Sequence, residues 1–188
     1  MTYKPVGAML VTEVGMTRIP YTKLNKSAKD LKANILENAG IDLFPDVSTV
    51  EIPDEKSIRV KKISNDEVSL LVLYPGYYVF VTTPYKIALP KGIHGIIFGR
   101  SGNFFKSGVD VFHGVIDSSY RGPIKVGLKF YSTGIFNIKN DIAVAQLVLI
   151  GYDTGSFFEM VEVSEEEFAE KYANTERGER GFGSSGHI

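Results

Sequence analysis

The sequence predicts an all-β fold, a sandwich or barrel of short strands, from two observations. Runs of aromatic and β-branched residues recur at residues 77–89, 94–98, 124–131 and 142–150. Turn signals rich in Gly, Pro, Asn or Asp stand between these runs. Many short strands separated by frequent turns are typical of β-sandwiches and β-barrels.

The four runs differ in their patterns. Residues 77–89 (YYVFVTTPYKIAL) are aromatic and β-branched, residues 94–98 (HGIIF) are short and apolar, and residues 124–131 (IKVGLKFY) alternate apolar with polar or small side chains. Residues 142–150 (IAVAQLVLI) are nearly all apolar, which predicts a strand buried on both faces. The intervening turns are expected at 74–76, 89–92, 132–134 and 139–141.

Two short helices are also expected. The first would begin at Ser27 as its N-cap and end near Gly40, with Leu31, Ile35 and Leu36 on one face. The second would begin at Ser164, because Ser and Glu three residues apart form a capping box.

Composition and charge exclude several classes of protein. The 188 residues contain no Cys and three His, and the net charge is -1. Disulfides, thiolate metal sites and a Cys nucleophile are therefore excluded, and the His spacing does not suit zinc. No nucleic-acid partner is expected, since no global positive field exists. No apolar run suggests a signal peptide or a membrane partner, so the cytoplasm is the expected compartment.

We expect one domain over residues 1–173 and an arm over residues 174–188. Within the domain, the charged segment 51–69 is expected to be a hairpin or a surface insertion. The arm (NTERGERGFGSSGHI) is rich in Gly and Ser, a composition that favours a disordered terminus. Its two Arg and one Phe suggest instead that it orders on a ligand.

The segment 114–122 (GVIDSSYRG) carries candidate chemistry on a strand end and turn. Gly at both ends would let the backbone approach a planar ligand closely. Tyr120 could stack on a sugar or base, and Asp117 could take a proton from water. Taken alone, the segment is better explained as an Asx-type turn with a packed Tyr.

Two shorter segments suit phosphate and metal. Arg100, Ser101 and Gly102 offer donors and an open backbone to phosphate oxygens, although an ordinary β-turn has the same composition. Asp42, in residues 38–44 (NAGIDLF), could hold a water of hydrated magnesium, or could accept hydrogen bonds from turn amides.

Taken together and in order, these segments resemble the five motifs of the trimeric dUTPase family (deoxyuridine 5′-triphosphate nucleotidohydrolases). The matching segments are residues 39–43 (AGIDL), 100–102 (RSG), 114–122 (GVIDSSYRG), 145–147 (AQL) and 177–186 (RGERGFGSSG). The resemblance spans residues 38–186. It implies a distorted jelly-roll β-barrel, a homotrimer with active sites shared between subunits, and an arm that closes each site.

The resemblance implies hydrolysis of dUTP to dUMP and pyrophosphate with Mg²⁺ as cofactor, which limits uracil in DNA and supplies dUMP for dTMP synthesis. Asp117 would activate the water that attacks the α-phosphorus, and Tyr120 would stack on the deoxyribose. Arg100 and Gln146 would complete the catalytic set at the phosphates, while Asp42 would reach the metal through water.

The remaining residues implied by the resemblance bind substrate. The backbone of Gly114, Val115 and Ile116 would pair with uracil. Phe182 would stack over the base from the arm. The residues implied to contact the phosphates or line the closed site are Ser101, Gly102, Arg177, Gly183, Ser184 and Ser185.

The chain departs from the family pattern in several places. Gly99 stands where the family usually has Pro, and Arg180 where it has Gly. Residues 140–144 (NDIAV) lack the usual charged pair, which leaves the role of Asp141 open. The N-terminal residues before Asp42 and the segment 51–69 exceed a minimal family member.

Two rival functions remain. The dCTP deaminases share the fold but need a general acid/base carboxylate where this chain has Gly127, so no deaminase activity is expected. The other rival is a non-catalytic or dual-role regulator that binds a protein partner, for which the extra segments could serve.

Overall fold

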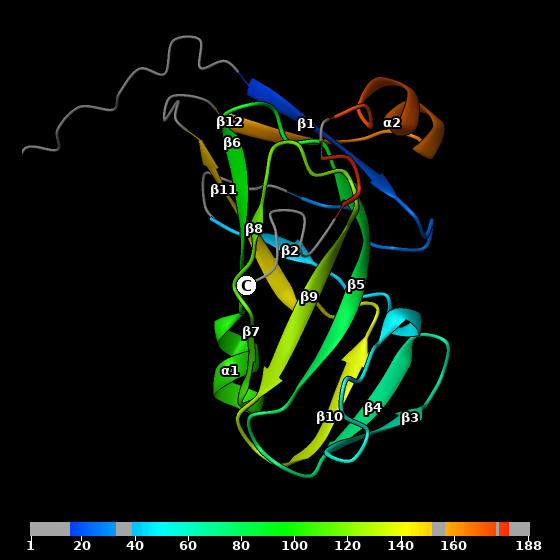
Figure 1. Ribbon diagram of the computed structural model, residues 1–188, viewed down its shortest axis with the longest axis vertical. Helices are drawn as coiled ribbons and strands as arrows, with labels where there is room; N and C mark the ends of the chain where they lie inside the picture. Colours follow the sequence, from blue (N-terminus) through cyan, green and yellow to red (C-terminus); the bar gives the residue numbers. More distant parts are fainter. Residues whose placement is uncertain (1–15, 33–38, 152–156, 176, 181–188) are drawn as a thin grey trace, which may run out of the picture.

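The computed structural model describes residues 16–32, 39–151, 157–175 and 177–180, and these form twelve β-strands, two α-helices and one 3-10 turn (Figure 1). The all-β prediction with one or two short helices is confirmed. In this part of the chain no helix has the length and apolarity needed to cross a membrane.

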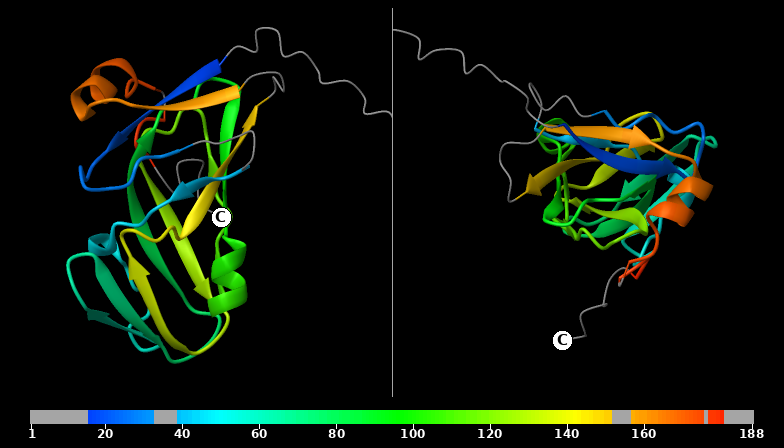
Figure 2. Two further views of the ribbon diagram at one scale, coloured as in Figure 1. Left: turned by 180° about the vertical axis from the view of Figure 1, so that it is seen from behind. Right: turned by 90° about the horizontal axis from the view of Figure 1, so that it is seen from above.

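The strands form three sheets, which Figure 2 shows from behind and from above. The five-stranded sheet contains, in order, β12 (Phe157–Glu162), β1 (Met16–Lys23), β5 (Tyr78–Ile87), β9 (Pro123–Phe130) and β7 (Val109–Val111). The four-stranded sheet contains β2 (Ile41–Leu43), β11 (Ala145–Gly151), β6 (Ile93–Phe98) and β8 (Val115–Ile116). The three-stranded sheet contains β10 (Gly134–Lys139), β4 (Glu67–Val72) and β3 (Ile58–Lys62).

The strands β5 and β9 run along most of the molecule's length and join its two ends (Figure 1). The small sheet of β3, β4 and β10 lies at one end, and β1, β12 and α2 (Glu165–Lys171) lie at the other. Every strand pair is antiparallel except β1 with β12, which is parallel. The segment 51–69 contains β3 and the first half of β4, which pair antiparallel as a hairpin, one of the two forms expected for this segment.

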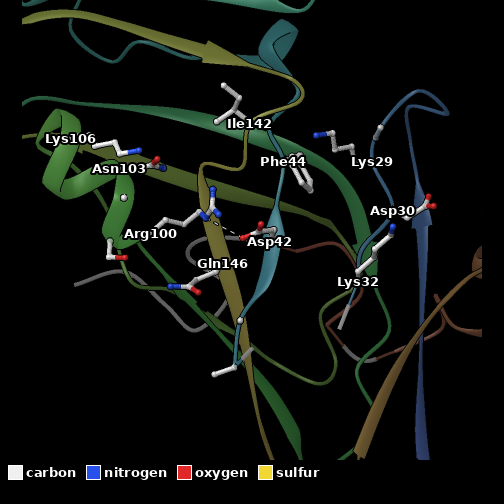
Figure 3. A pocket seen from close by; sticks show the side chains of 15 residues that line it. Lys29, Asp30, Lys32, Asp42, Phe44, Arg100, Asn103, Lys106, Ile142 and Gln146 are labelled. Carbon is white, nitrogen blue, oxygen red and sulfur yellow. Dashed lines mark ion pairs between the residues drawn. The ribbon is translucent and has the colours of Figure 1, made fainter. Parts of the chain in front are cut away.

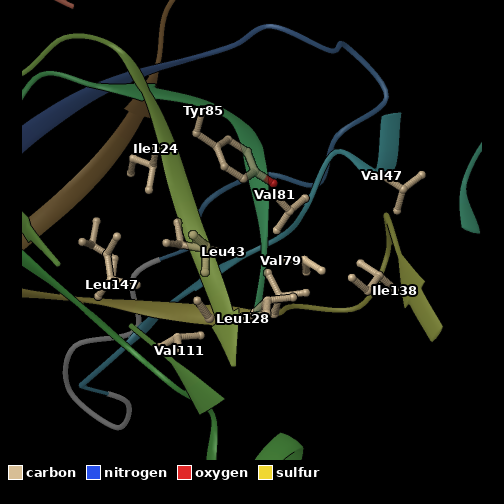
Figure 4. Packing of buried hydrophobic residues seen from close by; sticks show 14 of the residues in the cluster. Leu43, Val47, Val79, Val81, Tyr85, Val111, Ile124, Leu128, Ile138 and Leu147 are labelled. Atoms are coloured by element: carbon tan, nitrogen blue, oxygen red, sulfur yellow. The ribbon is translucent and has the colours of Figure 1, made fainter. Parts of the chain in front are cut away.

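The core lies between the sheets and fixes the strands that carry the site. Leu43 and Leu147 from the four-stranded sheet are fully buried against residues of β5 and β9, as Figure 4 shows. Tyr85 is also fully buried, and its hydroxyl donates a 2.7 Å hydrogen bond to the Lys29 carbonyl. This contact satisfies the one polar atom of the Tyr85 side chain and holds the segment before β2 against the core.

The prediction for residues 142–150 is correct in type and wrong in extent. The strand β11 begins at Ala145, because Ile142 closes a turn by donating its N–H to the Lys139 carbonyl at 3.2 Å. The predicted burial of residues 142–150 on both faces is also wrong in the single chain. The side chains of Ile142 and Ile150, at the two ends of this run, are 50% and 48% exposed.

The helix predicted from Ser27 is wrong over the described residues. Residues 24–28 form turns and bends and 29–32 have no regular structure, whereas residues 33–38 lie outside the described part. The Asn25 side chain accepts hydrogen bonds from both the N–H and the hydroxyl of Ser27, at 3.0 and 2.8 Å. Asn side chains compete in this way with helical hydrogen bonds, which explains the turn.

A helix appears instead at α1 (Ser101–Ser107), directly after Arg100. It ends at Gly108, which has a φ of 62° and donates its N–H to the carbonyls of Asn103 and Phe104. Glycine at a left-handed helix end is a recognised stop signal. The sequence pattern did not reveal this helix, since Arg100, Ser101 and Gly102 also fit an ordinary β-turn.

The second predicted helix, α2, is confirmed together with its cap. The Ser164 hydroxyl accepts a 3.0 Å hydrogen bond from the Glu167 N–H. We expect Ser164→Ala to lower the free energy of unfolding by about 1 kcal/mol, measured by urea denaturation. Ser27→Ala is the matched control, because Ser27 caps no described helix, and it should change stability by less than about 0.5 kcal/mol. Equal effects of the two variants would contradict this role of Ser164.

Candidate active site

A pocket of about 1280 Å³ lies between α1 and the four-stranded sheet, and it contains Asp42, Arg100 and Gln146 (Figure 3). Strand pairing explains two of the three, because Asp42 on β2 lies directly opposite Gln146 on β11. Arg100 comes from the end of β6 and pairs through its Nε with the Asp42 carboxylate at 3.1 Å. Three segments that are distant in the sequence thus meet at one pocket.

The Gln146 side chain is fixed by its neighbours. Its Nε2 donates a 2.8 Å hydrogen bond to the Gly99 carbonyl. A Cβ at Gly40 would lie 2.2 Å from the Gln146 Oε1 atom, so Gly40 must lack a side chain for this amide to keep its place. The segment 39–43 therefore contributes the space that the Gln146 amide occupies and the Asp42 carboxylate of the pocket.

Ser101 and Gly102 begin α1 and line the same pocket. Gly102 has no described atom within 4 Å of the position a Cβ would take, so its backbone is open on that side. Such a strand-to-helix junction, with an adjacent Arg100, suits an anionic group.

Sequence reasoning missed three cations of this pocket: Lys29, Lys32 and Lys106. In Figure 3, Lys106 lies on the side of Arg100, whereas Lys29 and Lys32 lie across the pocket. The Lys29 ammonium stands 5.0 Å from the centre of the Phe44 ring and donates to the Asp141 carbonyl at 2.8 Å. Asp141 thus has a role in placing Lys29 through its main chain. No local motif marks these lysines, because they join the pocket only through the fold.

Asp117 and Tyr120 lie on one turn that follows β8. The Tyr120 N–H donates to the Asp117 carbonyl at 3.0 Å, which closes the turn. The Tyr120 hydroxyl donates to the Pro123 carbonyl at 2.8 Å, and burial raises the pKa of this phenol above its usual value. The phenol therefore stays protonated at ordinary pH and keeps its donor role.

The two glycines that flank this turn have different surroundings. Gly114 has one described atom near the position of a Cβ, the Ile97 Cδ1 at 3.8 Å, and its carbonyl accepts a 2.9 Å hydrogen bond from the Ile97 N–H. A Cβ at Gly122 would lie 2.5 Å from the Tyr120 hydroxyl oxygen. Gly122 thus makes room for the Tyr120 ring, a reason that the sequence did not reveal.

Arg177 extends from the C-terminal arm onto the same turn. It forms an ion pair with Asp117, and its guanidinium carbon lies 5.2 Å from the centre of the Tyr120 ring. Gly178 bridges Tyr120 in a parallel β-contact. The other predicted arm residues, Phe182, Gly183, Ser184 and Ser185, lie outside the described residues.

The turn and the pocket lie apart along β6. Ile116 of β8 pairs with Gly95, whereas Arg100 follows Gly95 by five residues of extended chain. At about 3.3 Å per residue, Arg100 is roughly 16 Å from the Gly95–Ile116 pair. Asp117 does not line the pocket. A single described chain therefore holds two separate halves of the predicted site.

Within the described part of the chain, no cluster of three or more His, Asp or Glu could hold a metal ion alone. Asp42 and Asp30 are the carboxylates that line the pocket. Magnesium commonly uses only one or two carboxylates together with waters and substrate phosphates. The donor set of this pocket fits that mode.

The family model and three curated relatives that match this chain are all dUTPases. A family model described as dUTPase matches residues 68–186. The deoxyuridine 5′-triphosphate nucleotidohydrolase of Candida albicans is 42% identical over 106 residues, which is 56% of this chain and 62% of that protein. The enzyme of the same name from Rhizobium johnstonii is 35% identical over 123 residues, which is 64% of this chain and 73% of that protein. The mitochondrial enzyme of Homo sapiens is 30% identical over 174 residues, which is 93% of this chain and 57% of that protein. The match thus spans less than two thirds of the Candida and human proteins.

Solved structures support the fold. The dUTPase of phage phi11 of S. aureus, in a structure concerned with a structural Mg(II) ion, has a TM-score of 0.54 at 18% identity and covers 77% of this chain and 97% of its own. A mutant of the Staphylococcus bacteriophage 80alpha dUTPase, in a structure with dUpNHpp, has a TM-score of 0.53 at 23% identity. The match covers 90% of this chain and 98% of the phage chain.

Proposed function

The chain belongs to the dUTPase family, and we propose that it hydrolyses dUTP to dUMP and pyrophosphate. The observation that carries the proposal is the meeting of Asp42, Arg100 and Gln146, from three distant segments, around one pocket. In the proposed reaction, water attacks the α-phosphorus and its oxygen forms the new P–O bond. The bond from the α-phosphorus to the bridging oxygen breaks, and pyrophosphate leaves.

The pocket would take the triphosphate. Arg100 offers a planar fork of donors to phosphate oxygens, and Ser101 and Gly102 offer a hydroxyl and an open backbone. Lys29 and Lys106 add positive charge on opposite sides of the pocket (Figure 3). Phosphoryl transfer depends mainly on positioning and on neutralising charge, and this set supplies both.

Asp42 would meet Mg²⁺ through water. When bound, the metal ion neutralises phosphate charge and fixes the conformation of the triphosphate. Asp42 can serve this role because Arg100, with which it forms an ion pair, would turn to the phosphates. The structural Mg(II) ion described for the phage phi11 dUTPase is consistent with this proposal.

The turn after β8 would hold the nucleoside and the reacting water. Asp117 would orient the water and accept its proton, and Tyr120 would stack on the deoxyribose and exclude a 2′-hydroxyl. The backbone of residues 114–116 would read uracil, since hydrogen-bond readout discriminates strongly between bases. The arm over residues 174–188 would close over the nucleotide as a lid, with Phe182 on the base.

The separation of the turn from the pocket favours a site shared between chains. Arg100 and Asp117 would meet on one nucleotide only if the two residues came from different subunits of a homotrimer with threefold symmetry. Exposed apolar side chains provide surface for such contacts, among them Phe105 at 83% and Val115 at 62% exposure.

Mixing two inactive variants tests the shared site. Asp117→Asn and Arg100→Met should each be inactive alone, whereas co-expressed chains should recover about a quarter of the parent rate per site. The recovery is expected because random assembly gives each site an intact Asp117 and an intact Arg100 with a chance of about one half each. If purified mixed oligomers stay as inactive as the single variants, the shared site is wrong.

The dCTP deaminase alternative is disfavoured by packing at Gly127. A Cβ there would lie 2.5 Å from Phe112 Cδ2, so the position cannot carry a carboxylate in this arrangement. We expect no ammonia release from dCTP, measured in a coupled assay with a dCTP deaminase as the positive control. Sustained ammonia release would overturn this expectation.

Magnesium-dependent turnover tests the proposed function against the regulator alternative. The protein should release pyrophosphate from dUTP with Mg²⁺ and lose this activity with a chelator. A folded protein that binds but does not hydrolyse dUTP under these conditions would support the non-catalytic regulator instead.

A further inference from the structure

We propose that Arg121 is a positioning residue for the reaction, because its buried guanidinium joins the turn of Asp117 and Tyr120 to the root of the C-terminal arm. This inference rests on the proposed function. The Arg121 side chain donates its hydrogen bonds to main-chain carbonyls and not to the Asp117 carboxylate. It acts on the main chain that carries Asp117 and Tyr120.

The first set of Arg121 hydrogen bonds fixes the turn of Asp117 and Tyr120. The Arg121 Nη1 atom donates hydrogen bonds to the carbonyls of Ser118 and Tyr120, each at 2.7 Å. These carbonyls lie inside and at the end of the turn that the Tyr120 N–H closes onto Asp117. Fixing both carbonyls fixes the backbone orientation from which the Asp117 carboxylate and the Tyr120 ring project.

The second set of Arg121 hydrogen bonds holds the end of α2 and the arm. The Arg121 Nε atom donates a 2.7 Å hydrogen bond to the carbonyl of Tyr172, the residue that ends α2. The last carbonyls of a helix need partners from outside it, and Arg121 supplies one. The Arg121 N–H also donates to the Gly178 carbonyl at 2.8 Å, so one residue contacts both the end of α2 and the arm.

Thr175 strengthens the same junction. Its hydroxyl donates to the Ser119 carbonyl at 2.5 Å and accepts from the Gly178 N–H at 3.0 Å. These contacts hold the start of the arm against the turn, where Arg177 forms its ion pair with Asp117. The position of Arg177 on the reacting carboxylate thus depends on a junction whose buried centre is Arg121.

The surroundings of Arg121 favour a positioning role over general charge balance. The residue is 8% exposed, and no ion pair among the described residues includes it. Three main-chain carbonyls are its acceptors, and they would be left unpaired without it. A lysine could not replace it, because an ammonium is a point charge that lacks the fixed fork of the guanidinium.

The test compares Arg121→Met and Arg121→Lys with the parent protein. Arg59→Met is the matched control, because Arg59 is exposed on β3 and far in sequence from the site. For each protein, kcat and KM for dUTP are measured well below the melting temperature. Trypsin cleavage after Arg177 is measured in the absence of nucleotide and reports how firmly the arm root is held.

Both Arg121 variants are expected to stay folded and to lose kcat by about 30-fold or more, because small misplacements of reacting groups have effects of this size. Trypsin cleavage after Arg177 should become about tenfold faster or more, since a looser junction opens more often. Arg59→Met should match the parent in both measurements.

Three results would overturn the proposal. They are a kcat within about twofold of the parent in Arg121→Met, full rescue of kcat by lysine, or the failure of both Arg121 variants to fold, which would make the residue a folding determinant only. A parent protein that does not hydrolyse dUTP would instead count against the proposed function, and trypsin cleavage would still report the junction.

Discussion

Asp117→Asn is expected to lower kcat for dUTP by about 10³-fold while leaving the fold intact. The amide has nearly the shape of the carboxylate but cannot accept a proton from the attacking water. The Asp117 side chain is 45% exposed, so no large change in packing accompanies the substitution. The measurement is kcat at saturating dUTP, together with the melting temperature.

Asp141→Asn is the matched control for this loss. Asp141 is exposed, and its known contact, the carbonyl that accepts from Lys29, belongs to the main chain and survives the substitution. The control should keep the parent rate. An Asp117→Asn variant with more than about a tenth of the parent kcat would remove Asp117 from the role of general base.

Deleting residues 175–188 is expected to leave a folded protein with kcat/KM for dUTP lowered by about 10²-fold or more. The deletion removes Arg177 from Asp117 and removes the proposed lid over the base. The buried core extends from Ile19 to Phe168 and lies wholly outside the deleted segment. Stability should therefore change little, which thermal unfolding measures.

A shorter deletion provides the control for the arm. Removing only His187 and Ile188 leaves the segment 177–186 complete and should preserve the parent kcat/KM. If the protein without residues 175–188 hydrolyses dUTP as fast as the parent, the arm does not complete the site.

Three strands were predicted well because each is marked locally. Aromatic and β-branched runs bounded by turns gave β5, β6 and β9 with ends displaced by few residues. The cap at Ser164 is also local, and α2 follows it. The helix expected from Ser27 failed because the Asn25 side chain takes the hydrogen bonds of the turn.

Arrangement in space could not be predicted from the same patterns. The parallel pairing of β1 with β12 joins segments from opposite ends of the chain, and strand patterns do not specify partners. Likewise, Arg177 and Asp117 are 60 residues apart in the sequence and meet only through the junction at Arg121.

The candidate site was predicted through the order of the motifs rather than through any motif alone. The first three motifs also fitted ordinary turns. The pairing of Asp42 with Gln146 across β2 and β11 gives that part of the candidate site its geometry. Lys29 and Lys106 could not be predicted, because they reach the pocket from outside the motifs.

Pyrophosphate release from dUTP, dTTP, dCTP and UTP, measured side by side with Mg²⁺, tests the central claim most directly. We predict that kcat/KM for dUTP exceeds that for each other nucleotide by about 10²-fold or more, because in the proposed mechanism the turn of residues 114–122 would read uracil and Tyr120 would exclude a 2′-hydroxyl. Equal rates on all four nucleotides, or no release from dUTP, would contradict the assignment.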